Sequence, residues 1–365
     1  MIRVKDITKS LEQWAPLNYQ ESYDNSGLII GDPNGQVEQI LITLDVTESV
    51  IKEAITHGCN LIVAHHPLIF KGVKKINQKH WVDRCITLAI KNEIAIYAIH
   101  TNLDNVHTGV NRKIAEKLDL NNPQILAPKT GTLQKMITFI PIENTEKVLK
   151  AMYDAGAGQI GEYDHCSFRV TGTGSFRPGE GTNPHIGEAN KDEFVEENRV
   201  EIIFPSERAN NILAALQNAH PYEEVAYYLS NLENINQEIG SGMIGELNEA
   251  MDISDFMIYL KEKMELKMIR HTRLVKDKVR KIAFCGGSGS FLLPKAINRQ
   301  ADVFITGDFK YHDFFEADDR IIIMDIGHYE SEVFTKDLIY AELSKKFANI
   351  ALRLSEVNTN PVQYT

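Results

Sequence analysis

The sequence predicts an α/β protein in which two similar α/β halves form one layered core domain, with an α+β domain inserted between them. Three observations support this class. Apolar strand-like runs alternate with helical patterns near both ends of the chain, the middle changes to a β-α-β-β-α-β order, and a length of 365 residues suits about two domains. The content of 43% hydrophobic and 24% charged residues is ordinary for a globular protein.

The first half of the core follows from its elements in chain order. An amphipathic pattern predicts a helix over residues 1–16. Strands are expected at 40–47, at NLIVAHHP (60–67) and at IAIYAIHTNLD (94–104), and helices at 48–57, 80–91 and 110–118. Apolar strands separated by helices are typical of a parallel sheet that is covered on both faces.

The second half repeats this alternation. Strands are expected at KIAFCGG (281–287), ADVFITGD (301–308) and IIIMDIGH (321–328), and helices at 291–300, 312–319 and 329–347. The run IALRLSE (350–356) is expected to close the sheet as an edge strand. The core is therefore assigned to residues 1–128 plus 234–365.

The middle of the chain, residues 129–233, has a different rhythm. Strands are expected at KMITFIP (135–141), SFRVTGTGSFRP (167–178), RVEIIFP (199–205) and EEVAYYL (223–229), and helices at 144–155 and 206–219. This β-α-β-β-α-β order is the ferredoxin-like pattern. The run HPYEE (220–224) is expected to form a turn.

Charge and composition argue against several partners. A net charge of −11 without any basic run predicts no binding of nucleic acid, although a local pocket for a phosphorylated small molecule remains compatible with it. No apolar run approaches the ~20 residues of a membrane helix, and the first residues lack the pattern of a signal peptide. The four cysteines form no C-x-x-C pair, which is typical of free thiols in a reducing compartment. We therefore expect a cytoplasmic protein.

The doublet His65-His66 is the strongest chemical signal in the chain, because it ends an apolar strand. Adjacent residues that leave a strand point in different directions, so one doublet can serve two neighbouring metal ions. The alternative is a pair of structural histidines held by hydrogen bonds. The doublet alone leaves both interpretations open.

Other predicted strands end in potential metal ligands as well. His100 and Asp104 follow one strand, and IIIMDIGH ends in Asp325 and His328. Open α/β sheets bind ligands beyond the carboxyl ends of their strands, so these side chains should meet at one edge. Glu332 shares a helical face with His328 if a helix begins there. The expected metal ligands are His65, His66, Asp104, His328 and Glu332.

Three imidazoles and two carboxylates suit a pair of divalent ions, with one carboxylate bridging. Zinc is the metal expected first, with iron, manganese and cobalt as alternatives. Two such ions would hold a hydroxide that attacks carbon or phosphorus. Proton transfer or ligand orientation is assigned to four further candidates, Asp45, His100, Asp308 and His312. Asp308 alternatively only caps the helix that follows it.

Several runs together resemble the Nif-three-like dinuclear metal-centre proteins, also called GTP cyclohydrolase type-two homologs. They are YDNSGLIIGD (23–32), LDVT (44–47), AHHPLIF (64–70), IHTNLD (99–104), GTGSF (172–176), HPYEEVAY (220–227), GMIGEL (242–247), CGGSGS (285–290), TGDFKYHD (306–313) and GHYESE (327–332). The resemblance covers essentially the whole chain, in order. It implies the same five ligands, with no departure from the family pattern at any of them.

The resemblance also implies an assembly and a class of insert. Such proteins form toroidal homohexamers whose metals face an internal cavity, and their longer members carry an insert similar to the trimeric PII and CutA proteins. A dimer of trimers with an insert at each end of the ring is the expected arrangement. Ring opening of GTP is one activity that the resemblance suggests.

Two functional hypotheses stay open at this stage. In the first, the protein is a metal-dependent hydrolase that acts on a small nucleotide-like or phosphorylated substrate. In the second, it is a metal-binding scaffold or sensor, with the PII-like insert as its regulatory part. Five ligands for two ions leave coordination positions open, which favours catalysis, whereas the lack of a distinctive general acid favours the scaffold.

Overall fold

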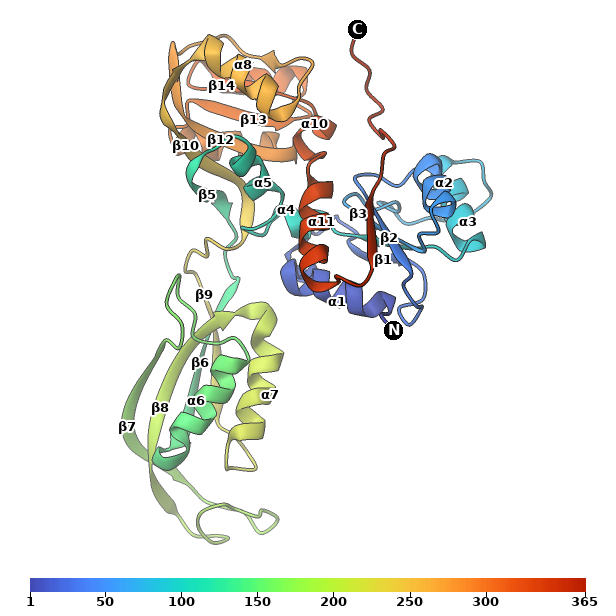
Figure 1. The fold of residues 1–365 in the computed structure, drawn as a ribbon. Helices are drawn as coiled ribbons and strands as arrows, with labels where there is room; N and C mark the ends of the chain where they lie inside the picture. Colours follow the sequence, from blue (N-terminus) through green and yellow to red (C-terminus); the bar gives the residue numbers. More distant parts are fainter. The chain divides into compact units, whose positions relative to one another are not determined.

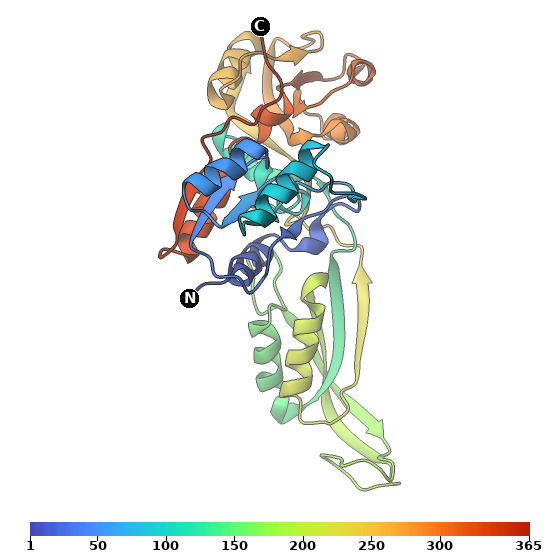
Figure 2. The ribbon, with the colours of Figure 1, turned by 90° about the vertical axis from the view of Figure 1, so that its right-hand side faces the viewer.

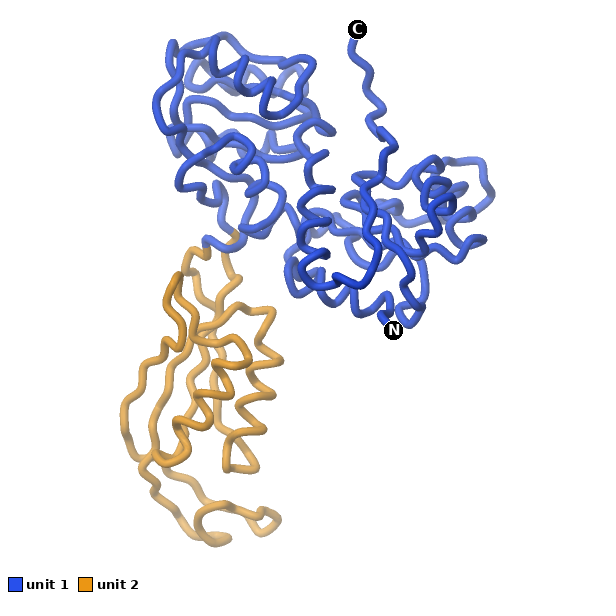
Figure 3. The backbone as a smooth tube through the Cα atoms, in the orientation of Figure 1, with its two compact units in different colours: residues 1–128, 237–365 blue, residues 129–236 orange.

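A computed structural model describes all 365 residues and divides the chain into two compact units (Figure 3). The core unit consists of Met1–Pro128 and Gln237–Thr365, and the insert consists of Lys129–Asn236. The core holds two mixed sheets with helices around them, so the predicted α/β class is confirmed.

The first sheet of the core has the strand order β1-β4-β3-β2-β15 (Figure 1). Its strands are β1 (Gly27–Ile30), β2 (Gln39–Thr43), β3 (Leu61–Ala64), β4 (Ala95–Ala98) and β15 (Ala351–Leu354). Around it lie α1 (Val4–Trp14), α2 (Glu48–Thr56), α3 (Trp81–Lys91) and α11 (Thr335–Lys346). Side chains of β2 and β3 alternate between two apolar clusters, one shared with α1 and the other with α2 and α3, so both faces of this sheet are buried.

The second sheet has the order β11-β14-β13-β12-β10-β5. Its strands are β5 (Asn121–Pro128), β10 (Gly240–Asp252), β11 (Arg270–His271), β12 (Lys278–Ser288), β13 (Val303–Gly307) and β14 (Ile322–Asp325). The helices α5 (Val110–Lys117), α8 (Ile253–Met264) and α9 (Leu293–Asn298) contact strands of this sheet. The longest helices of the protein have 12 residues, and none is long and apolar enough to cross a membrane.

The two halves of the core exchange strands. The N-terminal segment supplies β5 to the second sheet, and the C-terminal segment supplies β15, which pairs in parallel with β2 of the first sheet. One continuous apolar cluster contains buried residues of both halves, including Leu103 and Val110 from the first and Phe284 and Met324 from the second. This shared cluster makes the two halves one domain.

The expectation of parallel sheets is wrong for four strands of the core. Strands β2, β3, β4 and β15 are parallel, as are β12, β13 and β14, but β1, β5, β10 and β11 pair antiparallel. The strand β10 and helix α8 were not predicted at all. The antiparallel pair β5 and β10 brings Pro128 opposite Gly240, so the chain leaves this sheet for the insert and returns to it at neighbouring positions.

Two other segments differ from the prediction. HTNLD is not the end of a strand: β4 stops at Ala98, and residues Thr101–Asp104 form the short helix α4. The helix expected over 329–347 is broken into α10 (His328–Glu332) and α11. Because the backbone turns at both places, the side chains of Asp104 and Glu332 point toward His65.

The insert has its elements in β-α-β-β-α-β order. They are β6 (Leu133–Pro141), α6 (Thr145–Asp154), β7 (Ser167–Phe176), β8 (Glu193–Pro205), α7 (Ala209–Ala219) and β9 (Tyr227–Leu232). The strands form one antiparallel sheet in the order β7-β8-β6-β9. Figure 2 shows α6 and α7 on the same side of this sheet, where they bury a separate apolar cluster.

The shared cluster of the core should dominate the stability of that unit. Phe256 on α8 is fully buried in it, whereas Ile258 on the same helix is 58% exposed. We expect Phe256→Ala to lower the free energy of unfolding by about 3–5 kcal/mol, because it removes a buried ring and leaves a cavity. Urea denaturation followed by circular dichroism measures this, with Ile258→Ala as the control. Equal losses in the two variants would contradict the assigned packing.

Candidate metal centre

The histidine doublet lies where β3 ends, and the backbone amides of both residues still form hydrogen bonds to the neighbouring segment. The amides of His65 and His66 donate to the carbonyls of Thr43 and Leu44, which extends the pairing with the β2 segment beyond the strand. His65 is fully buried, and its Nδ1 lies 2.8 Å from the carbonyl oxygen of Ile99. Because a carbonyl oxygen only accepts, Nδ1 carries the hydrogen and the lone pair is at Nε2.

His66 turns in a different direction from its neighbour. Its Nδ1 lies 2.7 Å from Asp45 Oδ1, and its Nε2 lies 3.0 Å from Glu332 Oε2. Burial lowers the pKa of His66, but its hydrogen bonds to Asp45 and Glu332 outweigh burial and raise the pKa to about 9. The doublet therefore faces two sets of partners, as its position after a strand predicted.

His328 is the first residue of α10, and Glu332 ends the same short helix. His328 Nδ1 lies 2.7 Å from Asp308 Oδ2, and its Nε2 lies 3.0 Å from Glu332 Oε2. Burial lowers the pKa of His328, but the charge of Glu332 and the hydrogen bond to Asp308 raise it to about 11. This pair shares one helical face, as expected from the spacing of four residues.

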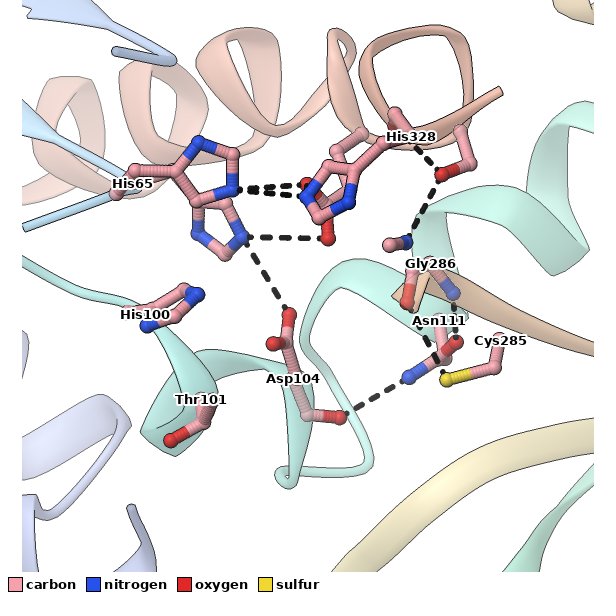
Figure 4. A network of polar contacts seen from close by, with 12 residues as sticks. His65, His100, Thr101, Asp104, Asn111, Cys285, Gly286 and His328 are labelled. Atoms are coloured by element: carbon pink, nitrogen blue, oxygen red, sulfur yellow. Dashed lines mark hydrogen bonds and ion pairs between the residues drawn. The ribbon is translucent and has the colours of Figure 1, made fainter. Parts of the chain in front are cut away.

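The two carboxylates of the cluster lie beside His65. Glu332 is 2% exposed, and its Oε1 lies 3.8 Å from His65 Nε2. Asp104 Oδ1 lies 3.6 Å from the same nitrogen (Figure 4). His65 Nε2 and Asp104 Oδ1 are buried and make no hydrogen bond. Burial, together with the charge of Glu332, raises the pKa of Asp104 to about 7.

Ligand atoms of these side chains form three overlapping groups that could each hold a metal ion, with the atoms of each group within 4.8 Å of one another. The groups are His65, His66 and His100; His66, His328 and Glu332; and His65, Asp104 and Glu332. Two of them share Glu332. All donors are nitrogen or carboxylate oxygen, which suits zinc and similar divalent ions. His65 Nε2 and Asp104 Oδ1, which are buried and make no hydrogen bond, belong to these groups, so the residues fit a cation.

His100, expected only to assist, lies within the cluster. Its ring centroid is 5.3 Å from that of His65 and 5.2 Å from that of His66. Its Nδ1 lies 2.7 Å from Asp24 Oδ1, and Asp24 Oδ2 accepts hydrogen bonds from the amide and hydroxyl of Thr101. Burial alone would raise the pKa of Asp24, but the bonds from His100 and Thr101 hold it well below its usual range.

Sequence reasoning did not single out Asp24 by itself, although it lies in the run YDNSGLIIGD. No local pattern connects it to His100, which lies 76 positions further along the chain. The other candidates are placed differently. Asp45 and Asp308 hold the rings of His66 and His328, whereas His312 is exposed on the 3-10 helix Tyr311–Ala317 and is not part of the cluster.

A buried polar network connects the cluster to the second sheet (Figure 4). Asn111 on α5 donates to the Asp104 carbonyl and accepts from the amide of Gly286. The Ser331 hydroxyl accepts from the Gly287 amide and donates to the His328 carbonyl. A side chain at Gly287 would collide with Glu332, so glycine there leaves the room that this carboxylate needs.

The cluster lines a cavity of about 750 Å³. Aromatic rings of Tyr23, Phe70 and Phe291 form part of its wall, and Arg270 is its only lysine or arginine. Arg270 Nη1 lies 3.1 Å from Asp325 Oδ2, so Asp325 supports the guanidinium instead of joining the histidines. The cavity therefore combines a polar cluster with flat apolar surfaces and one permanent positive charge.

A sequence model of the family described as Duf34/NIF3 (NGG1p interacting factor 3) matches residues 2–361. The chain belongs to the DUF34/NIF3 family. It is 38% identical to the Bacillus subtilis protein named "GTP cyclohydrolase 1 type 2 homolog" over 369 residues, which covers 99% of this chain and 98% of that protein. A relative of the same name from Halalkalibacterium halodurans is 38% identical over 363 residues, with 98% of each covered.

Solved structures of DUF34/NIF3 relatives share the fold. The crystal structure of a Bacillus cereus protein related to NIF3 has a TM-score of 0.89 and 38% identity, and the match covers 100% of this chain and 99% of that one. A Staphylococcus aureus protein has a TM-score of 0.79 at 30% identity, with the same coverage. The family resemblance found from the sequence motifs is therefore confirmed.

Asp24 should contribute stability that depends on pH. Its pKa is lowered by folding, so the contribution is present above the unfolded pKa of about 3.9 and is lost as the pH falls through and below that value. We expect Asp24→Asn to lower the free energy of unfolding at pH 7 by about 1–3 kcal/mol. Urea denaturation between pH 7 and pH 3 should show the difference from the wild type shrinking below about pH 4. A constant difference over this range would contradict the role, and exposed Asp255→Asn is the control.

Proposed function

We propose that the protein is a hydrolase that depends on two divalent metal ions held by His65, His66, Asp104, His328 and Glu332. The observation that carries the proposal is the convergence of fixed imidazole nitrogens on two carboxylates, with His65 Nε2 and Asp104 Oδ1 buried and without hydrogen bonds. Two metal ions, when bound, would activate water as a nucleophile and offset charge that develops on the substrate.

The overlapping groups suggest how the ligands divide between the ions. His65, Asp104 and Glu332 would hold one ion, and His66, His328 and Glu332 the other, with Glu332 shared. Zinc is the first candidate for this set of nitrogen and oxygen donors, and iron, manganese or cobalt are the alternatives. Asp45 and Asp308 then act as orienting groups, because each accepts from the Nδ1 of one ligand histidine.

His100 is the best candidate for moving a proton. It faces the ligand histidines and lines the cavity, and Asp24 holds its Nδ1. In this division of the ligands, His100 is the one histidine of the cluster whose Nε2 is not needed to hold a metal. A histidine oriented by a carboxylate can accept a proton from water or donate one to a leaving group.

The shape and charge of the cavity favour a small nucleotide-like or phosphorylated substrate. A volume of about 750 Å³ lies in the usual range for small-molecule sites. Rings of Tyr23, Phe70 and Phe291 suit a flat base, and the Arg270 guanidinium suits a phosphate. GTP is the first substrate to test, since the named relatives are called GTP cyclohydrolase homologs.

The assembly proposed from the family resemblance is a cytoplasmic homohexamer made of two trimers, with a PII-like role for the insert in trimer formation. Large apolar side chains on the sheet of the insert support self-association, because they are widely exposed: Phe168 is 68% exposed, Phe194 73% and Val170 50%. Apolar surface of this kind is typical of interfaces between protein chains.

Metal content is the direct test of the proposed centre. Elemental analysis of untagged protein, purified without added metal or chelator, should find about two divalent ions per chain. Glu332→Gln should lose at least one of them and lower turnover by at least about 100-fold, because partners that only orient a ligand already contribute 10–100-fold.

Exposed His312 provides the matched control for this experiment. His312→Ala should keep the metal content and the turnover of the wild type, because its ring lies outside the cluster. Wild-type protein that binds no metal even after reconstitution would refute the centre. Full metal content and activity in Glu332→Gln would refute its role as a shared ligand.

A metal-binding sensor is the second candidate, and a separate cavity in the insert favours it. The two functions respond differently to removal of the insert. Replacing residues 129–236 by a short Gly-Ser linker is feasible, because β5 and β10 are paired where the insert begins and ends. A hydrolase should keep two metals and turnover within about fivefold, as measured by elemental analysis and product formation. If the variant without the insert retains its metal but loses its response to a ligand completely, the result would favour the sensor.

A further inference from the structure

The insert contains a cavity of its own, of about 410 Å³. It lies on the face of the sheet opposite α6 and α7, since Phe139 and Glu197 alternate with the helix-facing residues Ile140 and Asn198. The segment between β7 and β8 and the turn before β9 complete its walls. The runs GTGSF and HPYEE contribute no residue to the metal cluster, and both supply residues to the wall of this cavity.

Aromatic rings form much of the wall. Phe139 and Tyr228 pack edge to face, with ring centroids 5.9 Å apart. Phe176 lies 6.0 Å and His185 lies 6.1 Å from the ring of Tyr222. Ring faces carry negative potential, so a cavity lined by several of them attracts positively charged groups.

A buried carboxylate lies in the same wall. Glu197 is 8% exposed, and no lysine or arginine lines the cavity beside it. Glycine at position 174 leaves room for this carboxylate, because a side chain there would collide with Glu197 Oε2. Tyr222 Oη is also buried, and it makes no hydrogen bond of good geometry. Burial and the nearby negative charge of Glu197 raise the pKa of the Tyr222 phenol. A buried carboxylate without a cation beside it is costly, so a cation in the cavity would be stabilising.

The remaining lining has the same sign of charge. Glu223 and Glu224 contribute two more carboxylates, His185 is the only basic side chain, and no lysine or arginine is present. This charge disfavours an anion. A hard divalent ion is also disfavoured, because such ions need about six oxygen ligands, and most of this wall is ring carbon, proline and isoleucine.

We propose that the cavity of the insert binds an organic cation, an ammonium or guanidinium group joined to a small apolar body, with Glu197 as its counter-ion. The rings of Phe139, Phe176, Tyr222 and Tyr228 surround the charged group, as in aromatic cages that recognise ammonium ligands. Tyr222 Oη accepts a hydrogen bond from the ligand. The proposal does not depend on the metal centre, which lies in the other unit.

Calorimetric titration of the full-length protein tests the proposal with three probes: phenethylammonium, agmatine and tetramethylammonium, each as the chloride. At least one should bind with one site per chain. The neutral compound 2-phenylethanol matches phenethylammonium in shape and should bind at least about tenfold more weakly, since it lacks the charge that Glu197 attracts. No binding of any probe, or equal binding of the neutral compound, would overturn the proposal.

Variants locate the binding site. Glu197→Gln should lower the affinity for the bound probe at least about tenfold. Glu196→Gln, at the exposed neighbouring position, should leave this affinity unchanged. Tyr228→Leu replaces a ring that is 60% exposed, so this variant should fold even if the Glu197 variant does not. It should lower the affinity for the probe about threefold. Unchanged affinity in Glu197→Gln, or in Tyr228→Leu, would overturn the assignment, as would Mg²⁺ or Ca²⁺ binding that Glu197→Gln abolishes.

Discussion

Each imidazole of the candidate metal centre is oriented through its Nδ1 by an oxygen that the fold holds in place. The oxygens come from the Ile99 carbonyl and from the carboxylates of Asp45, Asp24 and Asp308, which hold His65, His66, His100 and His328 respectively. This constraint turns the Nε2 atoms of His65, His66 and His328 toward Asp104 and Glu332. Four rings free to rotate would satisfy their hydrogen bonds elsewhere, so the preorganisation of the centre depends on these four contacts.

The centre also depends on the packing of the two halves of the core. His65, His66 and Asp104 come from the first half, whereas His328 and Glu332 come from the second. Neither half holds a complete set of ligands. The exchanged strands β5 and β15 and the apolar cluster common to both halves keep these residues together. The hydrophobic core therefore positions the chemistry, and loosening it would separate ligands that come from distant parts of the sequence.

The core and the insert place their charges in opposite ways. In the core, carboxylates are surrounded by histidines and by one arginine, which suits the proposed metal ions and an anionic substrate. In the insert, Glu197 is surrounded by rings and other carboxylates, which suits an organic cation. The insert starts and ends at paired residues of β5 and β10, so it adds this second surface without breaking the sheet that carries β12, β13 and β14. One chain can thus combine two recognition chemistries with little interference.

The sequence by itself determined the α/β class and the family, and it predicted the types of metal ligand, because these follow from local periodicity, from motifs and from side chains that end apolar runs. The helical pair His328 and Glu332 was predictable for the same reason, since a spacing of four residues fixes a shared face. The tertiary structure alone decided the antiparallel strands β1, β5, β10 and β11, the exchange of β15, and the partnership of Asp24 with His100. Contacts between residues far apart in the chain leave no local pattern, and they form only when packing and loop closure bring those residues together.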